Sequence, residues 1–213
     1  MQLLIATRSS GKMREIRRIL AEVPDLEVLG LDDAGVAYRS EEEELEPFDT
    51  FEQNALSKAR YFAERSGLAT VADDSGISVD ALGGAPGVRS KRFAPDGGAA
   101  PADLDGLPLD DANNRHLIER LRGVQPEDRT ARYVCVAALL ESADAEPVFF
   151  RGEAPGRIVD VPAGSGGFGY DPHVFNEALG RTYAEMTPSE KDARSHRGAA
   201  FRSLAAHLLD QTR

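Results

Sequence analysis

The stretch "LATVADDSGISVD", residues 68–80, indicates the fold class of this chain of 213 residues. A short apolar run leads into two adjacent aspartates, Asp73 and Asp74, and the chain turns apolar again soon after them. Such a run is typical of a buried strand, and we expect "LATVA" to deliver both carboxylates to its C-terminal end. In open α/β sheets, ligands bind at that end of a strand. Because neighbouring like charges cost stability unless a cation, a proton or solvent compensates them, the pair marks a candidate functional site.

Patterns on the N-terminal side of this stretch also predict an α/β protein. "QLLIAT" at residues 2–7 fits a buried strand, and "KMREIRRILAEV" at 12–23 has apolar residues at helical spacing. "TFEQNALSKARYFAERSG" at 50–67 predicts a helix, because Thr50 and Gln53 make a capping box at its start. The acidic run "SEEEELE" between these segments is expected to be a solvated loop or exposed edge.

The second half of the chain continues with strands and helices. "TARYVCVAALLES" at 130–142 and "EPVFFRGEAPGRIV" at 146–159 predict a pair of strands. Thr187, followed by a proline and a glutamate, predicts a helix start, and Ser195 is expected to cap a second helix. "APDGGAAPADLDGLPLDDAN" at 94–113 is rich in Pro, Gly, Ala and Asp, which predicts a mobile surface loop.

Composition restricts the function classes. With 41% hydrophobic and 29% charged residues and no apolar stretch long enough to span a bilayer, we expect one soluble domain over 1–213 and no membrane partner. The N-terminus lacks the pattern of a signal peptide, so the expected location is cytoplasmic. The net charge of -11 disfavours binding of nucleic acid along the surface. The single cysteine, Cys135, excludes an internal disulfide and a multi-cysteine metal site.

The loop "ATRSSGK" at 6–12 is a candidate anion site. It lies between a predicted strand and a predicted helix, where backbone N–H groups and Lys12 can hold a phosphate. It is not a Walker A loop, since that spacing needs Gly at Ala6 and Ser or Thr at Met13. A simple helix-entry turn explains the same residues equally well.

Asp73 and Asp74, together with the acidic stretch ending at Glu46, are candidate ligands for Mg²⁺. Hard oxygen donors from two segments suit this ion, which keeps several waters and bridges substrate phosphates. Adjacent side chains on a strand point to opposite faces, so we expect at most one aspartate to aim directly at the metal. The alternative is that one aspartate caps a turn and the other faces water.

Two further motifs offer contacts for a nucleobase. In "GSGGFGYD" at 164–171, glycines allow close backbone approach, an aromatic ring can pack on a base, and Asp171 can accept a hydrogen bond. "EKDARSHRG" at 190–198 gathers Lys191, His196 and Arg197 around a helix entry. Taken alone, each motif is also compatible with a purely structural role.

The ordered set of these motifs resembles the Ham1-like inosine triphosphate pyrophosphatase family, the non-canonical purine nucleoside triphosphate pyrophosphatases. The resemblance covers nearly the full chain. It rests on "ATRSSGK", "TFEQNALSKAR", "ADDSGISVDALGGAPGVRS", "PAGSGGFGYDP" and "SEKDARSHRG", which occur in the family's order. One departure is Ser9, where the family usually has Asn.

The resemblance implies an elongated, two-lobed mixed sheet flanked by helices, with the active site in the cleft between the lobes. It also implies a homodimer that hydrolyses ITP, dITP and XTP to the monophosphate and pyrophosphate with Mg²⁺ as cofactor. Two rival hypotheses are a related Maf-like nucleotide pyrophosphatase of other specificity and a nucleotide-binding sensor without turnover.

The resemblance also assigns roles to residues. Asp74 is implied as the general base and a metal ligand, Lys12 and Lys58 as catalytic groups near the phosphates, and Glu46 and Asp73 as support for the metal. The implied phosphate and nucleotide contacts are Thr7, Arg8, Ser9, Ser10, Gly11, Lys12, Ser75, Phe168, Gly169, Tyr170, Asp171, Lys191, His196 and Arg197.

Overall fold

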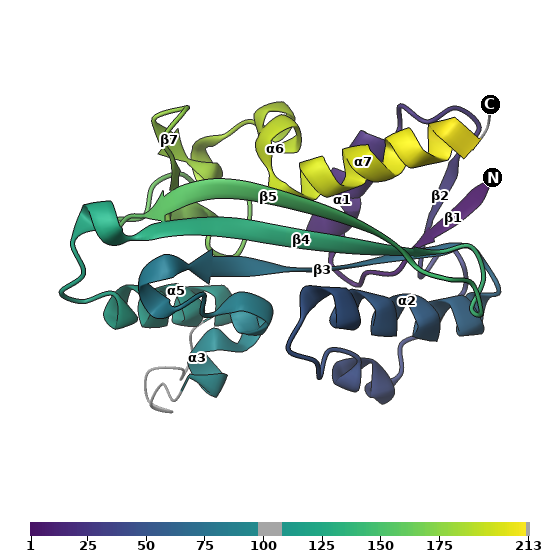
Figure 1. The fold of residues 1–213 in the computed structure, drawn as a ribbon, viewed down its shortest axis with the longest axis horizontal. Coiled ribbons are helices and arrows are strands. Elements are labelled where there is room, and N and C mark those ends of the chain that lie inside the picture. Colours follow the sequence, from purple (N-terminus) through teal and green to yellow (C-terminus); the bar gives the residue numbers. More distant parts are fainter. Residues whose placement is uncertain (98–107, 212–213) are drawn as a thin grey trace. The chain divides into compact units, whose positions relative to one another are not determined.

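The computed structural model describes residues 1–97 and 108–211 (Figure 1). Within these residues the strands form one sheet in the order β2-β1-β3-β4-β5-β6-β7. β1 pairs in parallel with β2 and β3, whereas β6 is antiparallel to β5 and to β7, so the predicted mixed sheet is confirmed. The strands are β1 Gln2–Ile5, β2 Glu27–Gly30, β3 Thr70–Val79, β4 Thr130–Leu140, β5 Val148–Ile158, β6 Val174–Asn176 and β7 Arg181–Thr182.

Helices flank this sheet. The α-helices are α1 Ser10–Leu20, α2 Phe51–Ser66, α3 Phe93–Asp96, α5 Leu109–Arg120, α6 Pro188–Arg194 and α7 His196–Gln211. Among the described residues, none of these helices is both long and apolar enough to cross a bilayer. Short 3-10 helices include η1 Ser40–Glu44 and η5 Asp171–His173.

The predicted helix caps are confirmed. Thr50 Oγ1 accepts a hydrogen bond from the backbone N–H of Gln53 at 3.2 Å and so begins α2. At α6, Thr187 Oγ1 accepts from the backbone N–H of Glu190, whose carboxylate accepts from the backbone N–H of Thr187. Ser195 Oγ accepts from the backbone N–H of Gly198 in the first turn of α7. Local sequence signals therefore placed these three helix starts correctly.

The position of the aspartates within their strand was predicted wrongly. β3 continues to Val79, so Asp73 and Asp74 lie in its middle and not at its C-terminal end. The strand continues because its second half packs closely against the segment that contains Gly87 and Ser90. A Cβ on Gly76 would lie 2.2 Å from the backbone oxygen of Gly87. The backbone N–H of Ile77 donates to Ser90 Oγ at 2.8 Å. Two adjacent aspartates therefore do not end this strand, because their carboxylates have hydrogen-bond partners.

The predicted loop at 94–113 is only partly a loop. α3 ends within it, and α5 begins within it at Leu109. Residues 98–107 lie outside the described part of the chain. The acidic run "SEEEELE" was expected as a loop or exposed edge, and it contains the short helix η1.

The chain divides into two compact units. The first unit comprises residues 1–74, 135–153 and 192–213, with α1 and α7 in contact on one face of its strands and α2 on the other (Figure 1). Its apolar core joins β1, β3 and β4 to α1 and α7. Core residues include Leu3, Ile5, Ile16, Leu20, Val71, Cys135, Leu139, Phe201 and Leu204.

The second unit comprises residues 75–134 and 154–191. Its separate apolar core packs α5 and α3 against the strands and the segment that follows β5. Core residues include Ile77, Val79, Phe93, Leu117, Leu121, Tyr133, Ile158, Tyr170, Val174 and Tyr183. Each unit therefore has an apolar core that can hold functional side chains in fixed positions.

Candidate active site

Asp73 is buried in the first unit on the face of β3 that carries α1 and α7. Its Oδ2 accepts hydrogen bonds from Lys12 Nζ at 3.0 Å and from the guanidinium of Arg197 at 3.4 Å. Burial alone would raise the pKa of Asp73, but the charges of Lys12, Arg197 and Lys58 hold it well below its usual range. The group is therefore a permanent anion, and it fixes the direction of two cations.

Asp74 points to the opposite face, toward α2. Its Oδ2 accepts from Asn54 Nδ2 at 3.0 Å, and its Oδ1 lies 3.9 Å from Lys58 Nζ. Burial raises the pKa of Asp74, and the nearby carboxylate of Glu46 raises it further, while Lys58 acts in the other direction. The expectation that adjacent aspartates face opposite ways is thus confirmed by their contacts. A carboxylate with a raised pKa is the better proton acceptor of the two.

Lys58 lies between two segments that carry acidic groups. Its ammonium donates to the carboxylate of Glu46 and to the backbone oxygen of Asp73, the latter at 2.6 Å. Burial alone would lower the pKa of Lys58, yet Glu46, Asp74 and Asp73 raise it above its ordinary value. The predicted groups Glu46, Lys58, Asp73 and Asp74 are therefore brought together in the first unit.

The surroundings of Lys58 bear on the predicted Mg²⁺. Among residues 1–97 and 108–211, no group of three or more His, Cys, Asp and Glu side chains is placed to hold a metal ion. Glu46 and Asp74 nevertheless both lie near one ammonium, so their oxygens already face a common positive charge. Two hard carboxylate donors with room for waters and phosphate oxygens match the chemistry of Mg²⁺. The donor set therefore fits this ion.

The loop at 6–12 leads directly into α1. Ser9 caps this helix by accepting from the backbone N–H of Lys12 at 3.3 Å, and Thr7 Oγ1 accepts from the backbone N–H of Ser9. Ser10 and Gly11 form the first turn, so their N–H groups lie at the helix N-terminus, where anions are favoured.

Arg8 of this loop has a different set of contacts. Its guanidinium donates to both oxygens of Glu42 at 2.8 and 2.9 Å and to the backbone oxygen of Val36 at 3.0 Å. Its Cζ lies 6.0 Å from the centre of the ring of Tyr38 and equally far from that of Phe62. In this structure Arg8 thus holds the segment around η1 in place.

Three residues with clear contacts in this unit were missed by sequence reasoning. Glu42 pairs with Arg8 and Arg65 through a side chain that is only 7% exposed, although one glutamate in a run of four gives no signal of this. Glu15 accepts from Arg197 at 2.7 Å, and its place on the buried side of α1 was the available signal. Asn54 is the third, and an Asn inside a helix is unfavourable enough to have drawn attention.

The glycine-rich motif lies in the second unit around Asp171. The carboxylate of Asp171 accepts from Lys191 Nζ at 2.6 Å, from Tyr133 Oη at 3.0 Å and from the backbone N–H of Phe168 at 3.0 Å. Lys191 Nζ also lies 4.6 Å from the centre of the half-exposed ring of Phe168. Gly167 has a φ of +73°, and a Cβ there would lie 2.0 Å from Asp171 Oδ2. The motif is therefore a tight turn wrapped around one carboxylate.

α5 anchors the same turn. The carboxylate of Asp110 accepts from the backbone N–H of Gly169 at 2.8 Å, and Asn114 Nδ2 donates to the backbone oxygen of Gly169 at 3.0 Å. Tyr170 is buried and donates to the backbone oxygen of Ser90 at 2.7 Å. Phe168 is thus the exposed aromatic ring of the turn, while Tyr170 secures it to the core.

The remaining predicted residues lie on β3 and at the start of α7. Ser75 follows Asp74 on β3 and begins the second unit. His196 and Arg197 begin α7 in the first unit, where both are buried. A Cβ on Gly152 of β5 would lie 2.1 Å from the backbone oxygen of His196, so this glycine permits the close packing.

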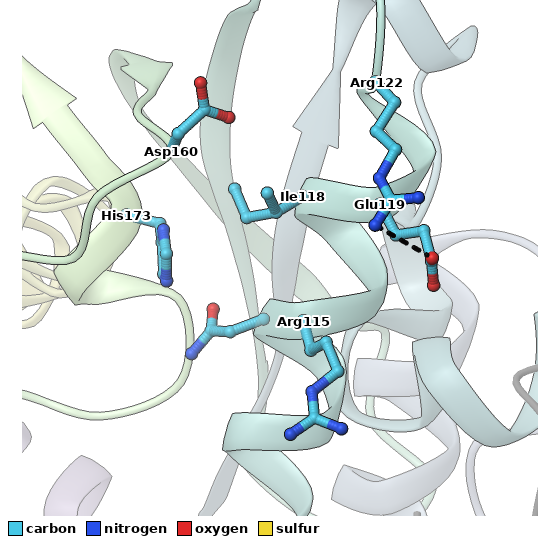
Figure 2. A pocket seen from close by; sticks show the side chains of 7 residues that line it. Arg115, Ile118, Glu119, Arg122, Asp160 and His173 are labelled. Carbon is cyan, nitrogen blue, oxygen red and sulfur yellow. Dashed lines mark ion pairs between the residues drawn. The ribbon is translucent and has the colours of Figure 1, made fainter. Parts of the chain in front are cut away.

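A separate cavity of about 340 Å³ lies beside α5 in the second unit. Figure 2 shows its lining, including the ion pair between Arg122 and Glu119 at 3.4 Å and the side chains of Arg115 and His173. None of the residues predicted from the sequence to hold substrate or metal lines this cavity.

These features define a class: a mixed α/β protein with a capped helix-entry loop, a carboxylate–lysine cluster beside one strand and a glycine turn backed by a buried ion pair. The model of the Ham1 family matches residues 3–207, and the chain belongs to that family.

Named relatives align with this chain over nearly its full length. The chain is 47% identical over 210 residues to a dITP/XTP pyrophosphatase of Mycolicibacterium paratuberculosis, which covers 97% of this chain and 95% of the relative. It is 45% identical over 210 residues to a dITP/XTP pyrophosphatase of Frankia alni, covering 99% and 98%. A solved structure of a HAM1 protein from Coxiella burnetii matches with a TM-score of 0.82 and 34% identity over 99% of both chains.

Proposed function

We propose that this chain hydrolyses non-canonical purine nucleoside triphosphates, namely ITP, dITP and XTP, to the monophosphate and pyrophosphate. Its relatives of 45 and 47% identity over nearly the full chain are named dITP/XTP pyrophosphatases. The observation that carries the chemistry is Asp74, a buried carboxylate with a raised pKa that lies 3.9 Å from an ammonium group. Such a group suits the activation of a water molecule beside a phosphate.

The first unit supplies the groups for phosphoryl chemistry. Asp74 accepts the proton of the attacking water, while the ammonium groups of Lys12 and Lys58 offset the negative charge that builds on the departing pyrophosphate. Mg²⁺, when bound, supplies further positive charge to the triphosphate, and Glu46 and Asp74 are the residues that would hold it. Asp73 supports this arrangement by fixing Lys12.

The helix-entry loop completes phosphate binding. The N–H groups at the start of α1, in Ser10 and Gly11, can donate to phosphate oxygens, and the N-terminal dipole of the helix favours the same charge. Thr7 and Ser9 shape this loop through their side-chain hydrogen bonds. Arg8 acts indirectly, since its guanidinium is already engaged by Glu42.

The second unit supplies contacts for the base. Phe168 offers an exposed aromatic face on which a base can pack, and a hydrogen-bond donor opposite position 6 of the base would complete the contact. A 6-oxo purine presents an acceptor at C6, where adenine presents a donor. A site built around such a hydrogen bond can reject the mismatched base by about 10⁴-fold.

The test is release of pyrophosphate from ITP, dITP, XTP, GTP and ATP, each with and without Mg²⁺. We expect the three non-canonical nucleotides to be cleaved with Mg²⁺, and kcat/KM for ATP and GTP to be more than tenfold lower. ATP or GTP within about tenfold of ITP, a gap of about 1.4 kcal/mol, would favour a pyrophosphatase of other specificity. Tight nucleotide binding without turnover would favour a sensor.

The proposal extends to the assembly and the location of the enzyme. We propose a homodimer that acts on the free nucleotide pool of the cytoplasm, which is supported by membership in the family. The net charge of -11 disfavours nucleic acid as an alternative substrate. Sedimentation equilibrium measures the assembly directly. A mass equal to that of one chain at micromolar concentration would contradict the dimer.

A further inference from the structure

Asn54 forms a bridge between two acidic parts of the first unit. It lies in the first turns of α2 and its side chain is buried, with 1% of the residue exposed. Its Nδ2 donates to Asp74 Oδ2 at 3.0 Å and to the backbone oxygen of Phe48 at 3.1 Å. Its Oδ1 accepts from the backbone N–H of Phe48 at 2.9 Å. Phe48 follows Glu46 by two residues, so one amide links both carboxylate-bearing segments.

Only a carboxamide of this length can make these three bonds. Two N–H donors and one acceptor are required at one place, and among side chains only Asn and Gln provide them on a planar group. Aspartate at position 54 would place a third carboxylate beside Asp74, and serine would reach neither partner fully. Asn is itself unfavourable within a helix, so its contacts must offset that cost.

We propose that Asn54 is a positioning residue for the hydrolytic reaction. By holding Oδ2 of Asp74, the amide fixes the plane of the carboxylate, and Oδ1 is left on the side of Lys58. By holding both backbone groups of Phe48, the same amide fixes the turn that places Glu46 next to Lys58. This inference rests on the proposed function, because positioning matters only if Asp74 and Glu46 do chemistry.

The structure offers a matched control in the second unit. Asn113 is equally buried, with 3% exposed, and its side chain also makes one acceptor and one donor bond to backbone. Its Oδ1 accepts from the N–H of Ala94 at 2.9 Å, and its Nδ2 donates to the oxygen of Lys91 at 3.0 Å. Within residues 1–97 and 108–211, the side chain of Asn113 bonds to backbone groups and to no carboxylate, so the two variants differ in the contact to Asp74.

The first experiment compares Asn54→Ser with Asn113→Ser. Both variants should lose thermal stability, since both lose two backbone hydrogen bonds, and Asn54→Ser should lose more because it also loses the bond to Asp74. For ITP with saturating Mg²⁺, Asn54→Ser should lower kcat at least ~10-fold with KM within about threefold, because misplacement of a reacting group by a fraction of an ångström is costly. Asn113→Ser should keep kcat within about twofold. Equal kcat losses in the two variants would overturn the inference.

The second experiment measures the contribution of the Asn54–Asp74 hydrogen bond to stability, without catalysis and without metal. Denaturant unfolding in EDTA is measured for wild type, Asn54→Ser, Asp74→Ala and the double variant. If the amide holds the carboxylate, Asn54→Ser should reduce the folding equilibrium constant at least ~fivefold less when Asp74 is already alanine. Additive losses would contradict the proposed contact. If wild type cleaves no purine triphosphate, the proposed function fails, whereas this unfolding cycle still decides the contact.

Discussion

Asp73 and Asp74 are neighbours in the chain, yet the pKa values of their carboxyl groups shift in opposite directions. Both are buried, but Asp73 faces Lys12 and Arg197, while Asp74 has the amide of Asn54 and the nearby carboxylate of Glu46. Alternation along β3 separates the two environments. A repulsive pair is thereby divided into a fixed anion that holds cations and a carboxylate suited to accept a proton.

For individual residues, the first prediction concerns Asp74→Asn. The substitution keeps the shape of the side chain and removes the charge needed to accept a proton, so kcat for ITP should fall at least ~10²-fold. The melting temperature should change little, because the asparagine oxygen can still accept from Asn54. Steady-state kinetics and thermal unfolding measure both quantities. A folded variant with near wild-type turnover would remove Asp74 from the mechanism.

Asp73→Asn should behave differently. Loss of this anion leaves Arg197 and Lys12 with less compensation, and Arg197 has only 1% of its surface exposed. Removing one partner of a buried ion pair typically costs about 3–5 kcal/mol. We therefore expect a large loss in the free energy of unfolding, measured by denaturant titration. A loss no greater than that of Asp74→Asn would show that the cations find compensation elsewhere.

For helices and strands, the sequence predicted those features that depend on contacts between residues close in the chain. The starts of α2, α6 and α7 follow from capping side chains and were predicted from the sequence. The length of β3 was not, because it depends on how closely Gly76 approaches Gly87 and Ser90, which are distant in the chain. The role of Glu42 was likewise hidden, since its partners Arg8 and Arg65 come from other segments.

The site was predicted to a similar degree. Sequence motifs named Glu46, Lys58, Asp73 and Asp74, which the structure gathers in one unit. They did not show that Asn54 would join these groups, because a buried amide carries no motif of its own. The roles assigned to these residues remain predictions for kinetics to test.

The acidic segment at η1 yields a prediction about pH. Burial alone would raise the pKa of Glu42, but its hydrogen bonds to Arg8 and Arg39 and the charge of Arg65 lower it. A lowered pKa means that the stabilisation is complete above the ordinary value of about 4.3 and is lost as pH falls through the folded-state pKa. Glu42→Gln should thus lower the melting temperature by roughly 4–8 °C at pH 7, about 2 kcal/mol, and by less below pH 4.

Glu43→Gln is the matched control for this effect, because Glu43 lies on the same helix but is exposed and accepts from Tyr38. Exposed contacts of this kind contribute about 0–1 kcal/mol, so its melting temperature should stay close to wild type. Thermal unfolding across pH 3–8 compares the three proteins. A deficit in Glu42→Gln that stays constant over this range would refute the ion pair as its cause.

α5 provides a prediction about substrate affinity. Asp110 and Asp111 both lie in its first turn and interact alike with the helix dipole, but Asp110 also accepts from the backbone N–H of Gly169. Asp110→Ala should loosen the glycine turn and raise KM for ITP about three- to tenfold with kcat little changed, since uniform binding is lost. Asp111→Ala should leave KM near wild type. Equal KM values in the two variants would exclude this anchoring role.

For the whole molecule, the sequence predicts one domain over residues 1–213, and the structure has two compact units. Each unit is assembled from separate stretches of the chain, and the four boundaries fall inside β3, β4, β5 and α6. A strand cannot melt over half its length without exposing hydrogen-bonding groups at the break. This continuity argues that neither unit unfolds alone.

Differential scanning calorimetry tests that expectation. We predict a single reversible transition whose calorimetric and van't Hoff enthalpies agree, because the three shared strands couple the two apolar cores during unfolding. Intrinsic fluorescence is a poor second probe, since the chain has no Trp, so far-ultraviolet circular dichroism and tyrosine absorbance should be followed instead. Asp73→Asn removes a contact within the first unit, and in a coupled molecule it should shift the whole transition to lower temperature without splitting it. Two resolved transitions, or a shift confined to one of them, would mean that the units unfold independently and that the chain contains two domains.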